Sequence, residues 1–166
     1  VADNFTQSQY FLAAHADKIL LNPMGSVLIT GIGAYGNYFR NALDKLDIKV
    51  HIFRAGDYKS AAEPFLRNNM SAEAKEDIST VINQLWQSYT QKVEGLRGLE
   101  KGTIDNLANN LHNQLQKTQG DTAKLAYEEG LIDYIATRSE MHNYLNSQIP
   151  NDIHGEFIAI DMPFYI

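Results

Sequence analysis

The sequence predicts an α/β fold with largely parallel strand pairing. Short apolar segments with strand character alternate with segments of helical periodicity, a pattern typical of parallel sheets flanked by helices. Hydrophobic residues make up 44% of the chain and charged residues 20%, so the chain can build a core. We therefore expect a parallel sheet, flanking helices and one long amphipathic helix.

The first third of the chain supplies the alternating segments. Each expected strand is a short apolar run bounded by turn residues, and each expected helix repeats apolar residues every three or four positions. The expected helices are 10–16 and 37–46, and the expected strands are 18–21, 27–30 and 49–53.

The long helix begins after Ser71, which is a favourable N-cap, and ends near Gly95 or Gly98. Its apolar residues recur at helical spacing, and we expect them to form core or a subunit contact rather than a ligand site. They are Ile78, Val81, Ile82, Leu85, Trp86, Tyr89 and Val93.

Shorter helices fill the last third. We expect them at 103–116, 123–129 and 139–145, with a short strand or turn at 131–133. Asp121 or Thr122 caps the second of them, and Gly130 suits the position just after it.

The charge balance argues against a nucleic-acid surface. The net charge is −6, and Lys and Arg form no run. No apolar stretch reaches the roughly 18–20 residues that span a bilayer, and no secretory signal pattern follows Val1. Because the chain opens on apolar Val1-Ala2 and closes on strand-like apolar segments, 157–160 and 164–166, we expect an internal fragment of a longer protein.

No metal or cofactor is expected. The sequence has no cysteine, so thiolate metal sites and a cysteine nucleophile are excluded. The five histidines have no i, i+4 partners and no carboxylate cluster in the sequence. They are His15, His51, His112, His142 and His154.

Lys59 is the candidate catalytic residue. It follows the expected strand 49–53 and sits in a turn with Gly56 on one side and small residues on the other. An unperturbed lysine has a pKa near ~10.4, and burial can lower it by ~3–5 units. A lysine folded inward there can serve as a general base, whereas most lysines after strands are simply solvated.

A glycine-rich turn supports an alternative, nucleotide binding. Gly31, Gly33 and Gly36 form a literal G-x-G-x-x-G between an expected strand and an expected helix. The next strand should end on an acidic residue, but it ends on Phe53-Arg54. A tight turn is the competing interpretation.

Candidate nucleophiles are few. Thr6 and Ser8 flank Gln7 just before the first helix, and a helix N-terminus is a favourable place for an oxyanion or a nucleophile. No G-x-S-x-G elbow is present. Ser60 adjoins Lys59, and adjacent residues rarely face each other.

A specific run extends from Gly56 to Phe65 and reads GDYKSAAEPF. It belongs to an ordered series with the segments 4–13, 16–19, 22–25, 42–46, 69–71, 85–89, 120–124 and 130–133. With this series the chain resembles the N-terminal half of the long, duplicated form of the signal peptide peptidase A (protease IV) family, and the run from Gly56 to Phe65 is the most specific match.

This resemblance implies a fold of the ClpP/crotonase type and a Ser/Lys dyad. Lys59 matches the family's base, which activates a serine in the C-terminal half. Gln7 stands at the nucleophile position of the first half, and the oxyanion-hole glycine belongs upstream of Val1. Arg54, Asp57 and Glu63 are candidates for shaping the environment of Lys59, and we expect both carboxylates to point away from it, because an ion pair would raise its pKa.

The resemblance also implies a role and partners. Residues 1–166 would be a partial N-terminal peptidase-like domain of a serine endopeptidase that degrades cleaved signal peptides at the periplasmic face of a bacterial inner membrane. Its partners would be the C-terminal half, peptide substrates and further copies of the chain, since relatives form tetramers. The isolated chain would be inactive, and a non-catalytic assembly scaffold is a further alternative.

Overall fold

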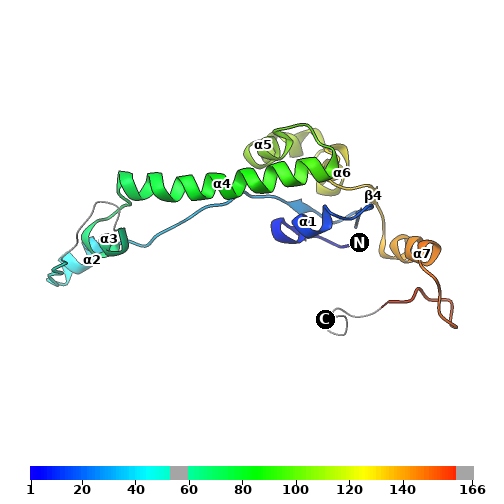
Figure 1. The fold of residues 1–166 in the computed structure, drawn as a ribbon, viewed down its shortest axis with the longest axis horizontal. Coiled ribbons are helices and arrows are strands. Elements are labelled where there is room, and N and C mark those ends of the chain that lie inside the picture. The colour runs from blue at the N-terminus through cyan, green and yellow to red at the C-terminus, as the bar shows by residue number, and fades with distance from the viewer. Residues whose placement is uncertain (53–59, 160–166) are drawn as a thin grey trace. The chain divides into compact units, whose positions relative to one another are not determined.

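The computed structural model describes residues 1–52 and 60–159 (Figure 1). Lys59, Arg54 and Asp57 lie outside these ranges. The described residues contain seven α-helices, one 3₁₀ helix and four short strands. The helices are α1 (Gln7–Ala13), α2 (Arg40–Lys45), η1 (Ser60–Ala62), α3 (Glu63–Leu66), α4 (Ala72–Arg97), α5 (Thr103–Lys117), α6 (Thr122–Glu128) and α7 (Arg138–Gln148). The strands are β1 (Phe5–Thr6), β2 (Leu20–Leu21), β3 (Val27–Leu28) and β4 (Tyr134–Ile135).

The chain groups into two compact units. The first comprises Val1–Thr30 and Gln91–Ile166, and the second comprises Gly31–Thr90. The long helix α4 is continuous across residue 90 and so belongs to both.

All strand pairing within the described residues of the first unit, apart from one isolated bridge near its C-terminal end, is parallel. Phe5 pairs with Val27 in the β1–β3 sheet, and Leu20 pairs with Tyr134 in the β2–β4 sheet. The expected α/β class with parallel strands is confirmed, although each pair is only two residues long.

The core of the first unit surrounds Tyr10 of α1, whose side chain is fully buried. Its hydroxyl donates a 2.6 Å hydrogen bond to the carbonyl oxygen of Leu131, which follows α6. Ile19, Leu21 and Ile104 are also essentially inaccessible to solvent. A buried phenol needs such a partner, so this bond ties α1 to the segment between α6 and β4.

The carboxylate of Asp133, at the end of that segment, has three partners. One carboxylate oxygen accepts a 2.7 Å bond from the backbone N–H of Ile19 and a 3.0 Å bond from the guanidinium of Arg97. The Nζ of Lys18 lies 3.4 Å from the other oxygen. Burial works to raise the pKa of Asp133, but the bonds from Ile19 and Arg97 outweigh it and hold that pKa below its ordinary value.

A buried acid, Glu94 of α4, caps the helix that follows. Its Oε1 accepts bonds from the backbone N–H groups of Gly102 and Ile104, at 3.0 and 3.1 Å. Gly102, with φ +93°, has no side chain to cap α5. Glu94 therefore replaces the missing local cap, because the first N–H groups of a helix have no partner within it.

Several expected helix signals are confirmed. The Oγ of Ser71 accepts a bond from the N–H of Ala74 at the start of α4, and Asp121 accepts one from Lys124 at the start of α6. Gly130, just past α6, has φ +71°, a conformation that favours glycine. The long helix ends at Arg97, directly before Gly98.

In the second unit the aromatic residues of α4 are half-buried. The rings of Trp86 and Tyr89 stack with centroids 5.5 Å apart. Burial raises the pKa of Tyr89 to about 12.

The expected strand 49–53 is wrong over the described residues 49–52, where no strand is present. Val50 and Ile52 are only half-buried, and a strand needs a hydrogen-bonded neighbour to persist. Phe53 lies outside the described residues.

Other boundaries also differ from the expected ones. The first helix begins at Gln7, three residues before Tyr10, because Thr6 and Gln9 form a capping box. The last helix extends from Arg138 to Gln148, beyond the expected 139–145. The expected strand or turn 131–133 is followed by the paired strand β4.

None of the helices in the described part of the chain is long and apolar enough to cross a membrane.

Asp133→Ala should lower the free energy of unfolding by about 3 kcal/mol at neutral pH, because it leaves the Arg97 guanidinium, only 9% exposed, without its carboxylate. Urea denaturation followed by circular dichroism measures this. Asp44→Ala, which removes an exposed i, i+4 pair with Arg40, is the control and should cost less than ~0.5 kcal/mol.

The stability of the fold should depend on pH, because the pKa of Asp133 is lowered in the folded state. The contribution of Asp133 to stability is fully present above its unfolded pKa, near 3.8, and is lost as pH falls through the lower folded pKa.

Equal losses of stability in Asp133→Ala and Asp44→Ala would contradict the central role of the Asp133 carboxylate.

Gly25→Ala should destabilise the fold by roughly 1–3 kcal/mol. A Cβ at this position would lie 2.2 Å from the backbone oxygen of Asp3 and 2.8 Å from that of Asn22. Gly95→Ala in α4 is the matched control, since its Cβ meets nothing within 4 Å, and it should stabilise by ~0.5–1 kcal/mol. Thermal unfolding of both variants tests the opposite signs.

Candidate active site

The structure describes the residues that directly follow Lys59. Ser60–Ala62 form the 3₁₀ helix η1, which continues into α3. The role of Lys59 itself stays a prediction, because it lies outside the described residues together with Arg54 and Asp57.

Glu63, four residues after Lys59, is 2% exposed. Its Oε2 accepts a 3.0 Å hydrogen bond from the backbone N–H of Ser71, directly before α4. A negative charge is favourable at this end of a helix, where N–H groups and the dipole point outward. The sequence indicated Ser71 as the cap but gave no signal for Glu63, which acts from eight residues away.

Gln7 is the first residue of α1, at the position that the family resemblance assigns to a nucleophile. Its Oε1 accepts a 3.1 Å bond from the backbone N–H of Thr30, just beyond β3. The helix is capped by Thr6, which is therefore already engaged. Ser8 is exposed on α1. The start of α1 thus presents an amide that accepts a backbone bond, and an amide cannot attack a carbonyl.

The glycine-rich turn lacks the geometry of a dinucleotide site. Gly31 has φ +83°, as a tight turn requires. β3 ends at Leu28, α2 begins only at Arg40, and residues 37–39 separate the last glycine from the helix. A phosphate site needs the glycines to lead directly into the helix N-terminus. The described residues therefore favour the turn.

Two of the histidines contact polar side chains nearby in the structure. His142 of α7 pairs with Glu156 at 2.6 Å, and His112 contacts Gln116 within α5. Within residues 1–52 and 60–159, no group of three or more His, Asp or Glu side chains is placed to hold a metal ion.

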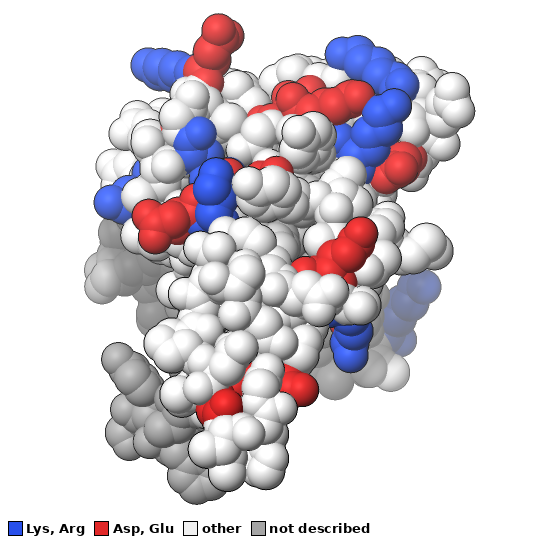
Figure 2. Space-filling view, turned by 90° about the vertical axis from the view of Figure 1, so that its right-hand side faces the viewer, with Lys and Arg blue, Asp and Glu red and all other residues white. Residues whose placement is uncertain are grey.

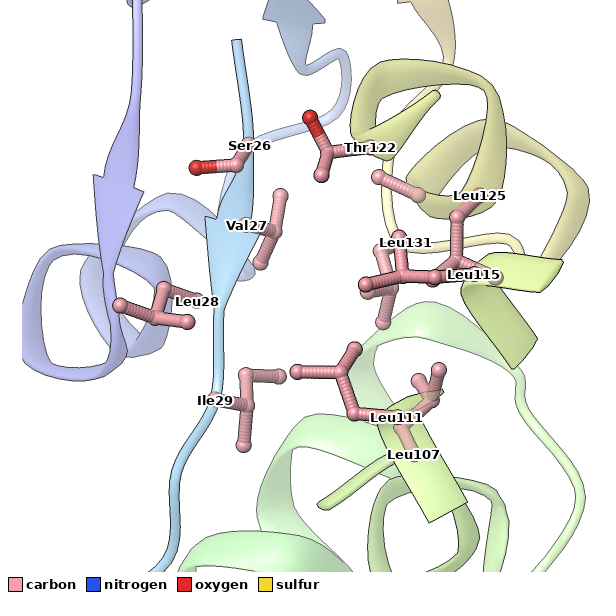
Figure 3. A pocket seen from close by; sticks show the side chains of 11 residues that line it. Ser26, Val27, Leu28, Ile29, Leu107, Leu111, Leu115, Thr122, Leu125 and Leu131 are labelled. Atoms are coloured by element: carbon pink, nitrogen blue, oxygen red, sulfur yellow. The ribbon is translucent and has the colours of Figure 1, made fainter. Parts of the chain in front are cut away.

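An apolar pocket of about 170 Å³ opens between β3 and the helices α5 and α6 (Figure 3). Leu107, Leu111 and Leu125 line it. The hydroxyl of Ser26 bonds to Asn4, and that of Thr122 bonds to the carbonyl of Gly25. The pocket therefore offers packing surface rather than reactive groups.

Charges of both signs are interspersed on the surface. On the face drawn in Figure 2, Lys and Arg side chains lie next to Asp and Glu and form no continuous basic patch. Elsewhere in the described residues, Arg138 pairs with Asp3, and the bond from Arg138 is the main cause that holds the pKa of Asp3 below its ordinary value. This face offers no nucleic-acid surface.

The family profile described as peptidase family S49 matches residues 1–146. The chain belongs to this family. It is 38% identical to Protease 4 of Haemophilus influenzae over 165 residues, which is 99% of this chain and 27% of that protein. It is 39% identical to Protease 4 of Salmonella typhi over 148 residues, 89% of this chain and 24% of that protein.

A plant relative is more distant. The chloroplastic serine protease SPPA of Arabidopsis thaliana is 20% identical over 157 residues, 95% of this chain and 22% of that protein. The S49 chain thus spans about a quarter of the length of the curated relatives that it matches. The resemblance seen in the sequence is confirmed.

Glu63→Ala should lower the free energy of unfolding by about 1–3 kcal/mol, because the N–H of Ser71 loses its buried acceptor. Glu63→Gln keeps an acceptor oxygen and should cost less. Glu73→Ala, in the exposed first turn of α4, is the control and should cost under ~1 kcal/mol. Chemical denaturation of the three variants compares them, and equal costs at the two positions would contradict the capping role of Glu63.

Proposed function

We propose that this chain is part of a Ser/Lys-dyad endopeptidase in which Lys59 is the general base. The observation that carries the proposal is the S49 match over residues 1–146, which includes the run from Gly56 to Phe65 around Lys59. The serine would come from another part of a longer protein, because the chain covers about a quarter of its relatives. We assign it the N-terminal half of the duplicated form.

The proposed mechanism needs two groups, a serine nucleophile and a lysine base. A serine hydroxyl becomes a nucleophile when a base lies within ~2.6–3.2 Å to take its proton. A neutral lysine can do this if burial lowers its pKa toward working pH. Gln7 supports the proposal, since its side chain accepts a bond from Thr30 and carries no hydroxyl. The isolated chain would therefore hold the base without the nucleophile.

The fold supports the same class of enzyme, a Ser/Lys-dyad endopeptidase. Parallel strand pairs flanked by helices agree with a ClpP/crotonase-type domain, which we propose for residues 1–166. Glu63, four residues after Lys59 in the sequence, is buried, and its carboxylate accepts a bond from the backbone N–H of Ser71. An ion pair between Glu63 and Lys59 would raise the lysine pKa, so we expect the two groups to lie apart in the active enzyme.

The proposal also covers the substrates, the cellular location and the assembly of the longer protein. We expect cleaved signal peptides as substrates, the periplasmic face of a bacterial inner membrane as the place, and assembly with the C-terminal half and with further copies. Protease 4 and serine protease SPPA are the names of the relatives on which this expectation depends.

Lys59→Ala in the longer protein should lower kcat for peptide hydrolysis by at least ~10²–10⁴-fold, the usual contribution of a general base. Lys59→Arg should be equally inactive, since a guanidinium stays protonated. Lys45→Ala, at the exposed end of α2, is the matched control and should retain activity. Turnover of a fluorogenic peptide measures all three.

Undiminished turnover of Lys59→Ala would refute the assignment of Lys59 as the general base. As a second readout, a serine-directed fluorophosphonate should label the longer protein but leave the isolated chain unlabelled. Labelling at Ser8 or Ser60 would show that this chain carries its own nucleophile.

A further inference from the structure

The carboxylate of Glu63 ties the segment that follows Lys59 to the start of the long helix. Its Oε2 accepts the 3.0 Å hydrogen bond from the backbone N–H of Ser71. Ser71 is itself buried, and its Oγ accepts a bond from the N–H of Ala74 in the first turn of α4. Two side chains therefore satisfy different N–H groups at the same helix end, where such groups have no partner within the helix.

The same segment is also bound to the start of α2 (Figure 1). The backbone N–H of Phe39 donates to the carbonyl oxygen of Pro64 at 2.6 Å. The guanidinium of Arg40 donates to the carbonyl oxygen of Leu66 at 3.0 Å. All of these residues belong to the second unit. The burial of Glu63 thus comes from this unit itself and needs no further part of the longer protein.

Lys59 is joined directly to this fixed segment. It precedes Ser60, the first residue of η1, and neighbouring Cα atoms in a chain lie ~3.8 Å apart. The position of η1 therefore limits where the main chain of Lys59 can lie. Catalysis is sensitive to such placement, because a displacement of about 1 Å can cost roughly 100-fold in rate.

We propose that Glu63 is a positioning residue of the active site, whose bond to Ser71 fixes the segment that carries the base Lys59. This inference rests on the proposed role of Lys59 as the general base. Glu63 acts here through the backbone of η1 and α3, without contact with the substrate. Its effect should therefore depend on the reach of its side chain to Ser71 more than on its negative charge.

An electrostatic role of Glu63 is the competing explanation. A carboxylate close to Lys59 would stabilise the ammonium form, raise the lysine pKa and lower the fraction of free base. The structure instead directs the carboxylate to the N–H of Ser71, at the positive end of the α4 dipole. Its charge is thus compensated by the helix that it caps.

The test separates reach from charge in the longer protein. Glu63→Gln keeps the length of the side chain and an acceptor oxygen, so kcat for a fluorogenic peptide should stay within about threefold of the wild type. Glu63→Asp keeps the charge but is one methylene shorter, so the bond to Ser71 is lost and kcat should fall at least about tenfold. KM should change less than about twofold in both variants, because neither alters a contact with the substrate.

Glu94→Asp is the matched control. Glu94 is also buried, and it accepts bonds from the N–H groups of Gly102 and Ile104 at the start of α5. It lies in the first unit, far from Lys59 in the sequence. The shortened side chain should cost a similar amount of stability, yet kcat should stay within about twofold at a temperature where circular dichroism shows every variant folded.

The pH profile of kcat is a readout that a loss of stability alone does not move. The rate should rise with pH through the pKa of the lysine base. In Glu63→Asp a displaced Lys59 is better solvated, so the midpoint of this rise should move upward by about half a unit or more. In Glu63→Gln and in Glu94→Asp the midpoint should stay within about 0.2 units of the wild type.

Lys59→Ala separates this inference from the function on which it rests. Full activity of that variant overturns the base assignment and the positioning role together. An inactive Lys59→Ala beside a Glu63→Asp with wild-type kcat overturns the positioning role alone. In the Lys59→Ala background, Glu63→Asp should leave the residual rate unchanged, because Glu63 acts through the lysine.

Two further results would also overturn the positioning role. One is a lower kcat in Glu63→Gln with a midpoint moved to another pH, which would indicate an electrostatic role. The other is an equal loss of kcat in Glu63→Asp and Glu94→Asp, which would indicate that both acids only stabilise the fold.

Discussion

The half-buried carboxylate of Asp133 is the interaction on which the rest of the first unit depends. It joins Ile19, the residue before β2, to Arg97 at the end of α4, and Asp133 itself directly precedes β4. The backbone N–H of Asp133 also donates to the carbonyl of Ile19 at 2.9 Å. With Leu131 bonded to Tyr10, the short segment after α6 connects helix, strand and core.

Two other acidic residues, Glu63 and Glu94, are buried. Glu63 accepts from the N–H of Ser71, and Glu94 accepts from those of Gly102 and Ile104. Each of these carboxylates satisfies backbone N–H groups at the start of a helix, which a buried charge requires in order to be tolerated. The buried acids that the structure describes are thus committed to architecture, and the proposed chemistry depends on a lysine.

Much of the helical structure could be predicted from local signals in the sequence. The long helix and the caps at Ser71 and Asp121 follow from periodicity and from side chains that reach three residues forward. The strand expected at 49–53 was wrong over 49–52, because apolar character favours a strand but only a neighbouring strand stabilises it. The predicted start of α1 at Tyr10 is three residues late, because the capping box formed by Thr6 and Gln9 begins the helix at Gln7.

The sequence by itself determined the α/β class, the caps at Ser71 and Asp121 and the family, since each rests on residues close together in the chain or on a specific run such as Gly56 to Phe65. Only the tertiary structure decided which distant groups meet. The hydroxyl of Tyr10 reaches Leu131, and the amide of Gln7 reaches Thr30. Local patterns extend over one helical turn, whereas the partner of a buried polar group is chosen by how the elements pack.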